Sequence, residues 1–132
     1  MQQQIEHYAS KLAFEIDSWD LAEARKAAED IVVLDARSAQ AHDREHIPDA
    51  ISFPHQRMVA EHTADLRRAA LYVVYCDGIG CNASTAGSLK MSQLGFKVKE
   101  LIGGLDWWKR SGFPTRGALS ARSEAAESCG CD

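Results

Sequence analysis

Two short apolar runs constrain the fold of this chain more than any other feature. Residues 31–34 read Ile-Val-Val-Leu and residues 71–75 read Leu-Tyr-Val-Val-Tyr. Both are rich in β-branched and aromatic side chains, and neither alternates with polar residues. Such runs predict strands that are buried on both faces, as in a parallel sheet covered by helices.

The segments around these two runs predict an α/β fold. Further strands are expected at residues 13–16, 51–53 and 98–101, and helices at 19–28, 58–69, 83–94 and 107–111. Asp17 or Ser18 is a suitable N-cap for the first of these helices, and Gly95 a suitable C-cap for the third. Strands that alternate with helices indicate a five-stranded, mainly parallel sheet flanked by helices.

Chain length and composition limit the organisation. A chain of 132 residues has room for one domain. We expect it to occupy residues 1–115, because beyond Pro114 no apolar period remains. Residues 116–132 are expected to form a polar, flexible C-terminal tail.

Charge and hydropathy exclude several classes of partner. The formal net charge is −4, and Lys and Arg never gather into a stripe, so no nucleic-acid partner is expected. No apolar run approaches the roughly 20 residues of a membrane span. The N-terminus lacks the basic and apolar regions of a secretory signal, and a cytoplasmic location is therefore expected. The oligomeric state stays open.

The cysteines form two close pairs, Cys76 with Cys81 and Cys129 with Cys131. In a reducing compartment, reactive or metal-binding thiols are a better interpretation than disulfides. Cys76 directly follows the strand at 71–75, where ligands of open α/β sheets bind. Backbone N–H groups of the following loop, and the N-terminus of the next helix, are expected to favour thiolate and lower the thiol pKa. Gly78 and Gly80 should let this loop turn tightly.

Five segments in order resemble the rhodanese superfamily over roughly residues 10–115. They are the strand ending in Asp-Ala-Arg at 35–37, the turn His-Ile-Pro-Asp-Ala at 46–50, Tyr-Cys at 75–76, Leu-Gly-Phe at 94–96, and Gly-Gly-Leu-Asp-Trp-Trp at 103–108 with Gly112 and Pro114. The resemblance implies a sulfurtransferase whose nucleophile is Cys76. The thiolate takes sulfane sulfur, holds it as a persulfide, and passes it to a thiol or another nucleophile.

The loop departs from the usual sulfurtransferase pattern. From Cys76 to Asn82 it holds seven residues, the length found in related phosphatases and arsenate reductases, which end the loop with an Arg. This chain has Asn82 there and no Lys or Arg in the loop, while Asp77 adds a negative charge. Phosphatase activity is therefore not expected, and a persulfide donor fits better than thiosulfate.

The resemblance thus defines a site without a cofactor. The substrate-binding residues are expected to be those of the loop: Asp77, Gly78, Ile79, Gly80, Cys81 and Asn82. No metal or organic cofactor is required. The expected partners are a small sulfane-sulfur donor or a persulfidated protein, and a thiol acceptor. Two alternatives stay open: a non-enzymatic rhodanese-type module that binds a protein, and a thiol redox sensor that uses Cys76 and Cys81.

Residues outside the loop have simpler expected roles. Asp35 and Arg37 should anchor the turn by an ion pair, His46 should be structural, and Trp108 should lie in the core. Cys81 is either a small loop residue or a thiol that resolves an oxidised Cys76. Cys129 and Cys131 are either without a defined role, a thiol relay, or a metal-binding tail.

Overall fold

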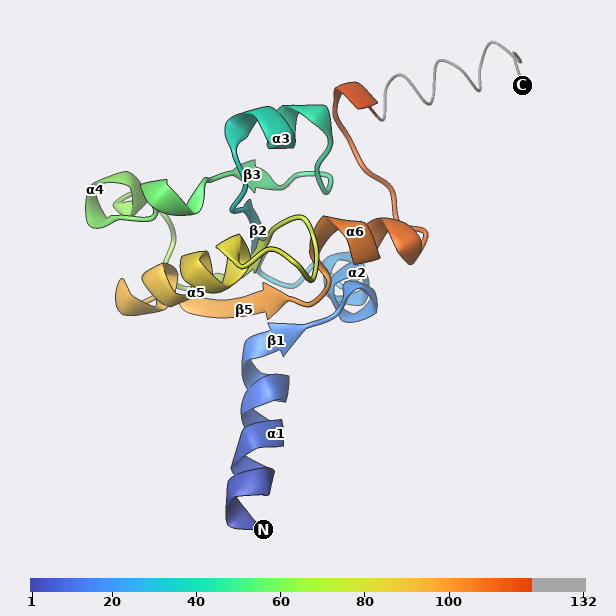
Figure 1. Ribbon diagram of the computed structural model, residues 1–132. Coiled ribbons are helices and arrows are strands. Elements are labelled where there is room, and N and C mark those ends of the chain that lie inside the picture. Colours follow the sequence, from blue (N-terminus) through green and yellow to red (C-terminus); the bar gives the residue numbers. More distant parts are fainter. Residues whose placement is uncertain (120–132) are drawn as a thin grey trace.

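A single five-stranded sheet organises the chain (Figure 1), and the computed structural model describes residues 1–119. All neighbouring strands pair in parallel, in the order β1-β5-β4-β2-β3. The strands are β1 (Glu15–Ile16), β2 (Ile31–Asp35), β3 (Ile51–Ser52), β4 (Leu71–Tyr75) and β5 (Lys97–Leu101). The predicted α/β class is confirmed.

Helices cover both faces of the sheet. They are α1 (Gln2–Phe14), α2 (Ser18–Lys26), α3 (Ala39–Arg44), the 3₁₀ helix η1 (His55–Arg57), α4 (Ala60–Thr63), α5 (Ala83–Gln93) and α6 (Gly104–Arg110). Asp17 caps α2 by accepting a hydrogen bond from the Asp20 N–H at 2.8 Å. Gly95 follows α5 with φ +91°, the left-handed conformation expected after a helix end.

Alternate residues of the central strand β4 face two separate apolar clusters. Val73 and Tyr75 pack with Leu21 of α2 and with Leu105 and Trp108 of α6. On the opposite face, Tyr72 and Val74 pack with Met58, Met91 and Phe96. Residues 72–75 of β4 are all buried, because both faces of the strand are covered.

Two expected elements differ from the structure, and the helices α1 and α3 were not expected. Residues 13 and 14 end the helix α1, so the first strand is only two residues long. The helix expected at 58–69 is reduced to the four residues of α4. Tyr72 donates its hydroxyl to the carbonyl of Arg67, and Arg67 pairs with Asp30, so tertiary contacts hold this segment out of a helix.

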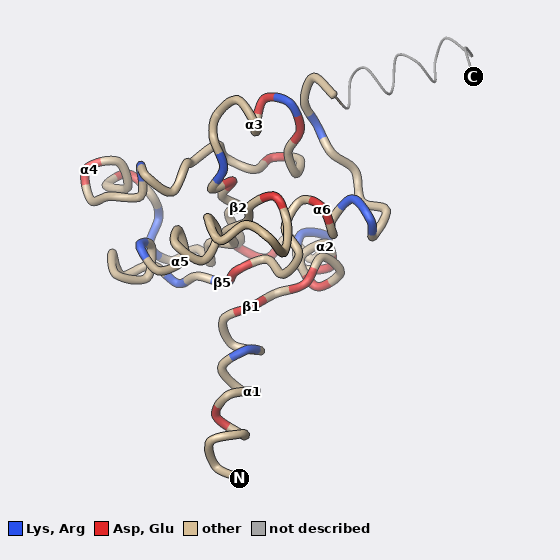
Figure 2. Tube along the Cα trace, in the orientation of Figure 1, with Lys and Arg blue, Asp and Glu red and all other residues tan. Residues whose placement is uncertain are grey.

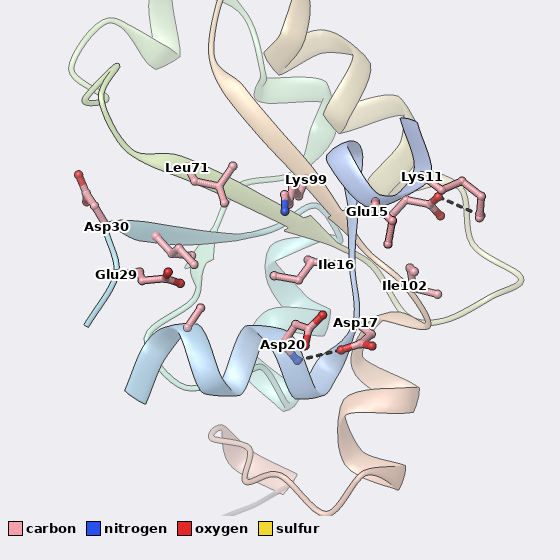
Figure 3. Close-up of a pocket in the computed structure, with 13 residues that line it drawn as sticks. Lys11, Glu15, Ile16, Asp17, Asp20, Glu29, Asp30, Leu71, Lys99 and Ile102 are labelled. Atoms are coloured by element: carbon pink, nitrogen blue, oxygen red, sulfur yellow. Dashed lines mark hydrogen bonds and ion pairs between the residues drawn. The ribbon is translucent and has the colours of Figure 1, made fainter. Parts of the chain in front are cut away.

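The surface carries scattered charge and a groove lined by both charged and apolar residues. Acidic and basic residues are interspersed along the described chain (Figure 2). A groove of about 560 Å³ lies between α2 and the sheet near the base of α1, with Ile16, Leu71 and Ile102 among its apolar lining (Figure 3). Among residues 1–119, no helix has both the length and the apolar composition of a membrane span.

Candidate functional site

Cys76 lies at the carboxyl end of β4, in the middle of the sheet. Its neighbours are β2 on one side and β5 on the other, so three strand ends surround it. The residue is only 1% exposed. The following loop therefore covers the sulfur, and a reactant reaches it only when the loop opens.

The groups nearest the sulfur differ from the expected cradle of N–H donors. The thiol of Cys76 donates to the carbonyl of Cys81, with 3.0 Å between Sγ and O, and the Gly78 carbonyl lies 3.9 Å away. The Ser84 Oγ is 3.4 Å from the sulfur. Carbonyl oxygens favour the protonated thiol over the thiolate.

The predicted direction of the Cys76 pKa is therefore wrong. Burial raises the pKa of this thiol, and contact with the side chain of Cys81 adds to the rise. The hydroxyl and the backbone N–H of Ser84 act in the opposite direction but do not outweigh burial. In this closed arrangement Cys76 is held as a neutral thiol.

The N-terminus of α6 anchors the loop from outside. The N–H of Leu105 donates to the Cys76 carbonyl at 2.9 Å, and the N–H of Asp106 to the Asp77 carbonyl at 2.8 Å. Gly104 makes this approach possible, because it has φ +57° and any Cβ there would collide with the Cys76 carbonyl.

The two loop glycines have different roles. A Cβ at Gly78 would lie 3.2 Å from the Cβ of Asp106, whereas a Cβ at Gly80 would meet nothing within 4 Å. Neither residue has a positive φ. The expectation that Gly80 is needed for a tight turn is therefore wrong, and Gly78 serves close packing against α6.

Arg37 connects the turn after β2 to the loop. It donates from Nε and Nη2 to the two carboxylate oxygens of Asp35, at 2.9 and 2.8 Å, which confirms the expected ion pair. From Nη1 it also donates to Asp77 at 3.1 Å. The negative charge of Asp77 is thus paired with a cation, which the sequence did not indicate.

Asp35 is the centre of a buried polar network. It is fully buried, and its Oδ2 also accepts from the Tyr75 hydroxyl at 3.0 Å and lies 3.0 Å from His42 Nδ1. Burial acts to raise the pKa of Asp35, but the bonds from Arg37 and His42 outweigh it and lower the pKa overall. The roles of His42 and Tyr75 were missed, because neither residue has a distinctive spacing in the sequence.

His46 and Trp108 are structural, as expected. The backbone of His46 pairs with that of Arg116 in an antiparallel bridge, and its Nδ1 lies 2.7 Å from the His42 carbonyl. Trp108 is 3% exposed and donates its indole N–H to the Pro114 carbonyl. The boundary at residue 115 stays a prediction, and the described contacts extend beyond it, to Leu119, which lines a cavity with Arg37 and Lys109.

A second polar chain leads from the sulfur to β5. Ser84, the second residue of α5, is buried and donates its hydroxyl to Glu100 Oε2 at 2.6 Å. Thr85 donates to the same oxygen at 2.7 Å. Glu100 therefore lies two hydrogen bonds from Cys76. No motif in the sequence indicated it, because it contacts the site across the sheet.

The remaining loop residues lie between two cavities. Cys81 is half-buried and lines both a cavity of about 360 Å³ beside Arg37 and His55 and a cavity of about 250 Å³ beside Glu100. Asn82 is the N-cap residue of α5 but makes no side-chain capping bond, and Ile79 is 90% exposed. Within residues 1–119, no group of three or more His, Cys, Asp or Glu side chains is placed to hold a metal. Cys129 and Cys131 lie outside the described residues.

Comparisons with known proteins agree with this architecture. Residues 18–111 match the family model of the rhodanese-like domain. A sulfurtransferase of Allochromatium vinosum is 29% identical over 76% of this chain and 92% of its own length. The thiosulfate sulfurtransferase GlpE of Coxiella burnetii is 30% identical over 71% of this chain and 82% of its own length.

Solved structures show the same fold. The crystal structure of the BH2092 protein from Bacillus halodurans has a TM-score of 0.84 at 39% identity, over 89% of this chain and 87% of the other. The solution structure of the rhodanese-like domain of the Anabaena protein Alr3790 has a TM-score of 0.72 at 28% identity, over 82% of each chain. With residues 18–111 matching the family model and Cys76 at the end of a central parallel strand, this chain belongs to the rhodanese-like domain family.

Proposed function

We propose that this chain is a sulfurtransferase that carries sulfane sulfur as a persulfide on Cys76. The observation that carries the proposal is the position of the sulfur: at the carboxyl end of β4, beneath a loop that begins α5. The Cys76 thiolate attacks the outer sulfur of a donor, and the donor leaves as a thiolate. A thiol acceptor then attacks the outer sulfur of the Cys76 persulfide and restores the free cysteine.

The loop favours a persulfide donor over thiosulfate. It has no Lys or Arg between residues 76 and 82, and Arg37, the cation that reaches it, is already paired with Asp35 and Asp77. A dianion such as thiosulfate therefore finds no free cation in the loop itself. We further propose a cytoplasmic location, in which a reducing environment would keep Cys76 and Cys81 as thiols.

The first prediction is that Cys76→Ser abolishes sulfur transfer and leaves the fold intact, because only the nucleophilic atom changes. Intact mass after incubation with a persulfide of a small thiol should show one added sulfur on the wild type. Thiocyanate release to cyanide should then fall to background in Cys76→Ser. Cys81→Ser is the matched control and should still be loaded. Activity that survives in Cys76→Ser would move the nucleophile to another residue.

A thiol redox function is the second candidate, and the contact between the two loop cysteines favours it. Mild peroxide converts the Cys76 thiolate to a sulfenic acid, and the Cys81 thiol can displace water from it to form a disulfide. This needs Cα atoms about 4.4–6.8 Å apart and therefore a loop that flexes.

We predict a Cys76–Cys81 disulfide after peroxide treatment, detected by non-reducing peptide mapping and reversed by a reductant. In Cys81→Ser, Cys76 should proceed to sulfinic acid instead. Equal rates of sulfinic acid formation with and without Cys81 would leave Cys81 as a small loop residue only.

A further inference from the structure

The nucleophile of the proposed sulfurtransferase is held in a state that cannot react. The Cys76 thiol is buried, and its proton points to the carbonyl of Cys81. Attack on a sulfane sulfur needs the thiolate, so the proton must leave first. The carbonyl of Cys81 cannot accept it permanently, and a separate proton acceptor is required.

The described contacts contain one continuous route from the sulfur to a carboxylate. Rotation about the Cβ–Sγ bond turns the thiol proton from the Cys81 carbonyl to Ser84 Oγ, which lies 3.4 Å from the sulfur. The hydroxyl proton of Ser84 already points to Glu100 Oε2 at 2.6 Å. Every link in this chain therefore has a donor and an acceptor in place.

We propose that Ser84 and Glu100 form a proton relay that converts the buried Cys76 thiol to a thiolate. This inference rests on the proposed function. The proton of Cys76 passes to Ser84 Oγ, and the hydroxyl proton of Ser84 passes to Glu100 Oε2. The products are a thiolate, to which the Ser84 hydroxyl now donates, and a neutral carboxyl group that donates to Ser84. No electron is transferred, and the net charge of the three side chains stays −1.

The relay also keeps a proton available while the leaving group departs. When the thiolate attacks a persulfide donor, the S–S bond of the donor breaks and a thiolate departs. The proton stored on Glu100 can return along the same chain or through the adjoining cavity of about 250 Å³, which Glu100 lines. Glu100 is thus a positioning and proton-holding residue that acts through Ser84. Ser84 touches the reacting sulfur directly.

The surroundings of Glu100 are consistent with this role. Thr85 donates to the same Glu100 oxygen and holds the carboxylate where it accepts the hydrogen bond from Ser84. The other titratable side chains that line this cavity are Glu15 and Cys81. Glu15 lies directly opposite Glu100 on the neighbouring strand, and it pairs with Lys11.

The relay predicts a distinctive pH profile. Within the relay the proton moves from Cys76 to Glu100, and none is exchanged with solvent. The ratio of the thiolate–carboxylic acid form to the thiol–carboxylate form therefore does not depend on pH while Cys76 and Glu100 share one proton. Direct loss of the thiol proton to solvent adds thiolate that rises about tenfold per pH unit, so the relay sets the rate only at acidic pH. Alkylation of Cys76 by iodoacetamide should therefore level off near about pH 5 and rise with pH above it. Reaction rates proportional to the iodoacetamide concentration would show that loop opening does not set the rate.

Glu100→Gln is the decisive variant. Its amide oxygen can still accept from Ser84 and Thr85, so the fold is kept, but it cannot hold the proton. We expect its alkylation to change about tenfold per pH unit down to about pH 5 without levelling off, and to be slower there than that of the wild type. Ser84→Ala should behave likewise. Glu15→Gln is the matched control for the same chemical change in the same cavity, and its alkylation should level off as that of the wild type does.

Two outcomes would overturn the relay. One is a wild-type alkylation rate that falls about tenfold per pH unit down to about pH 5 without levelling off. The other is faster alkylation in Glu100→Gln at every pH, the result expected if Glu100 merely repels the thiolate. Both are distinct from failure of the proposed function, because alkylation needs only the thiol. If the alkylation of Cys76 levels off at acidic pH but Cys76 never acquires a sulfur, the relay stands and the sulfurtransferase proposal fails.

Discussion

At the scale of single residues, Asp35 makes more of the contacts that hold the candidate site together than any residue of the loop 76–82. It is fully buried and binds Arg37, Tyr75 and His42 at once. Arg37 in turn reaches Asp77 in the loop. Loss of the Asp35 charge therefore leaves a buried guanidinium without its main partner, which is the costly way to break a buried ion pair.

We predict that Asp35→Asn lowers the free energy of unfolding by about 3–5 kcal/mol, as measured by urea denaturation at neutral pH. Asp30→Asn is the matched control: Asp30 also pairs with an Arg, Arg67, but on the exposed surface, so its loss should change stability little. Equal effects of the two variants would contradict a special role for the buried pair.

The same residue should set part of the acid sensitivity. The pKa of Asp35 in the folded protein is lowered from the ordinary value of 3.8. A lowered folded pKa gives a stabilisation that is fully present above the unfolded pKa and is lost as the pH falls through the folded pKa. The stability difference between wild type and Asp35→Asn should therefore be constant near neutral pH and shrink below about pH 4. A difference that shrinks already near neutral pH would assign the effect to another group.

At the scale of elements, α6 and the loop 76–82 make the closest backbone contact of the candidate site. Gly104 is in the left-handed conformation, and its Cα faces the carbonyl of Cys76 without room for a side chain. We predict that Gly104→Ala displaces the loop, lowers the free energy of unfolding by about 1–3 kcal/mol and reduces sulfur transfer.

Gly80→Ala is the control for stability, because a Cβ at that position meets nothing within 4 Å. Its urea midpoint should be close to that of the wild type. Retained loop geometry in Gly104→Ala, seen as unchanged transfer and unchanged stability, would contradict the close fit inferred here.

The same elements show how far the sequence predicts this structure. β4 lies at residues 71–75, as predicted, because an uninterrupted run of β-branched and aromatic residues followed by a glycine-containing loop is typical of a buried strand. The end of α5 was likewise marked by Gly95. Helix α1 was missed because no apolar cluster near it signals burial, and the segment after Met58 was overpredicted because tertiary contacts override local propensity.

Only those parts of the candidate site whose residues are close to one another in the sequence could be predicted. Cys76 follows β4 directly, so its place at a strand end could be inferred from order alone. Ser84, Glu100 and Gly104 reach the sulfur or its loop through the sheet order and helix packing, and no spacing in the sequence encodes those contacts. The pKa of Cys76 was predicted in the wrong direction because the orientation of loop carbonyls depends on the closed loop.

At the scale of the whole molecule, the sheet order explains why these groups meet at one sulfur. β4 lies between β5 and β2, so Glu100 approaches from one side and the Asp35–Arg37 pair from the other. The buried layers on both faces of β4 keep its end fixed. One element lies outside this arrangement: α1 extends away from the sheet (Figure 1) and has no buried residue.

We predict that this difference appears as a gradient of hydrogen exchange. A 13-residue helix without buried side chains is close to the length at which an isolated helix is marginal in water. The hydrogen-bonded amides of α1 should therefore open with a free energy below about 1 kcal/mol, while those of Val73 and Val74 in β4 exchange only on global unfolding.

Helix α5, with 11 residues, is the matched control, because it buries Ser84, Gly87 and Met91 and should be protected. Protection of α1 equal to that of α5 would contradict the prediction and show that something covers its apolar residues Ile5, Tyr8 and Leu12. Loss of that protection on dilution would then identify the cover as a second copy of the chain.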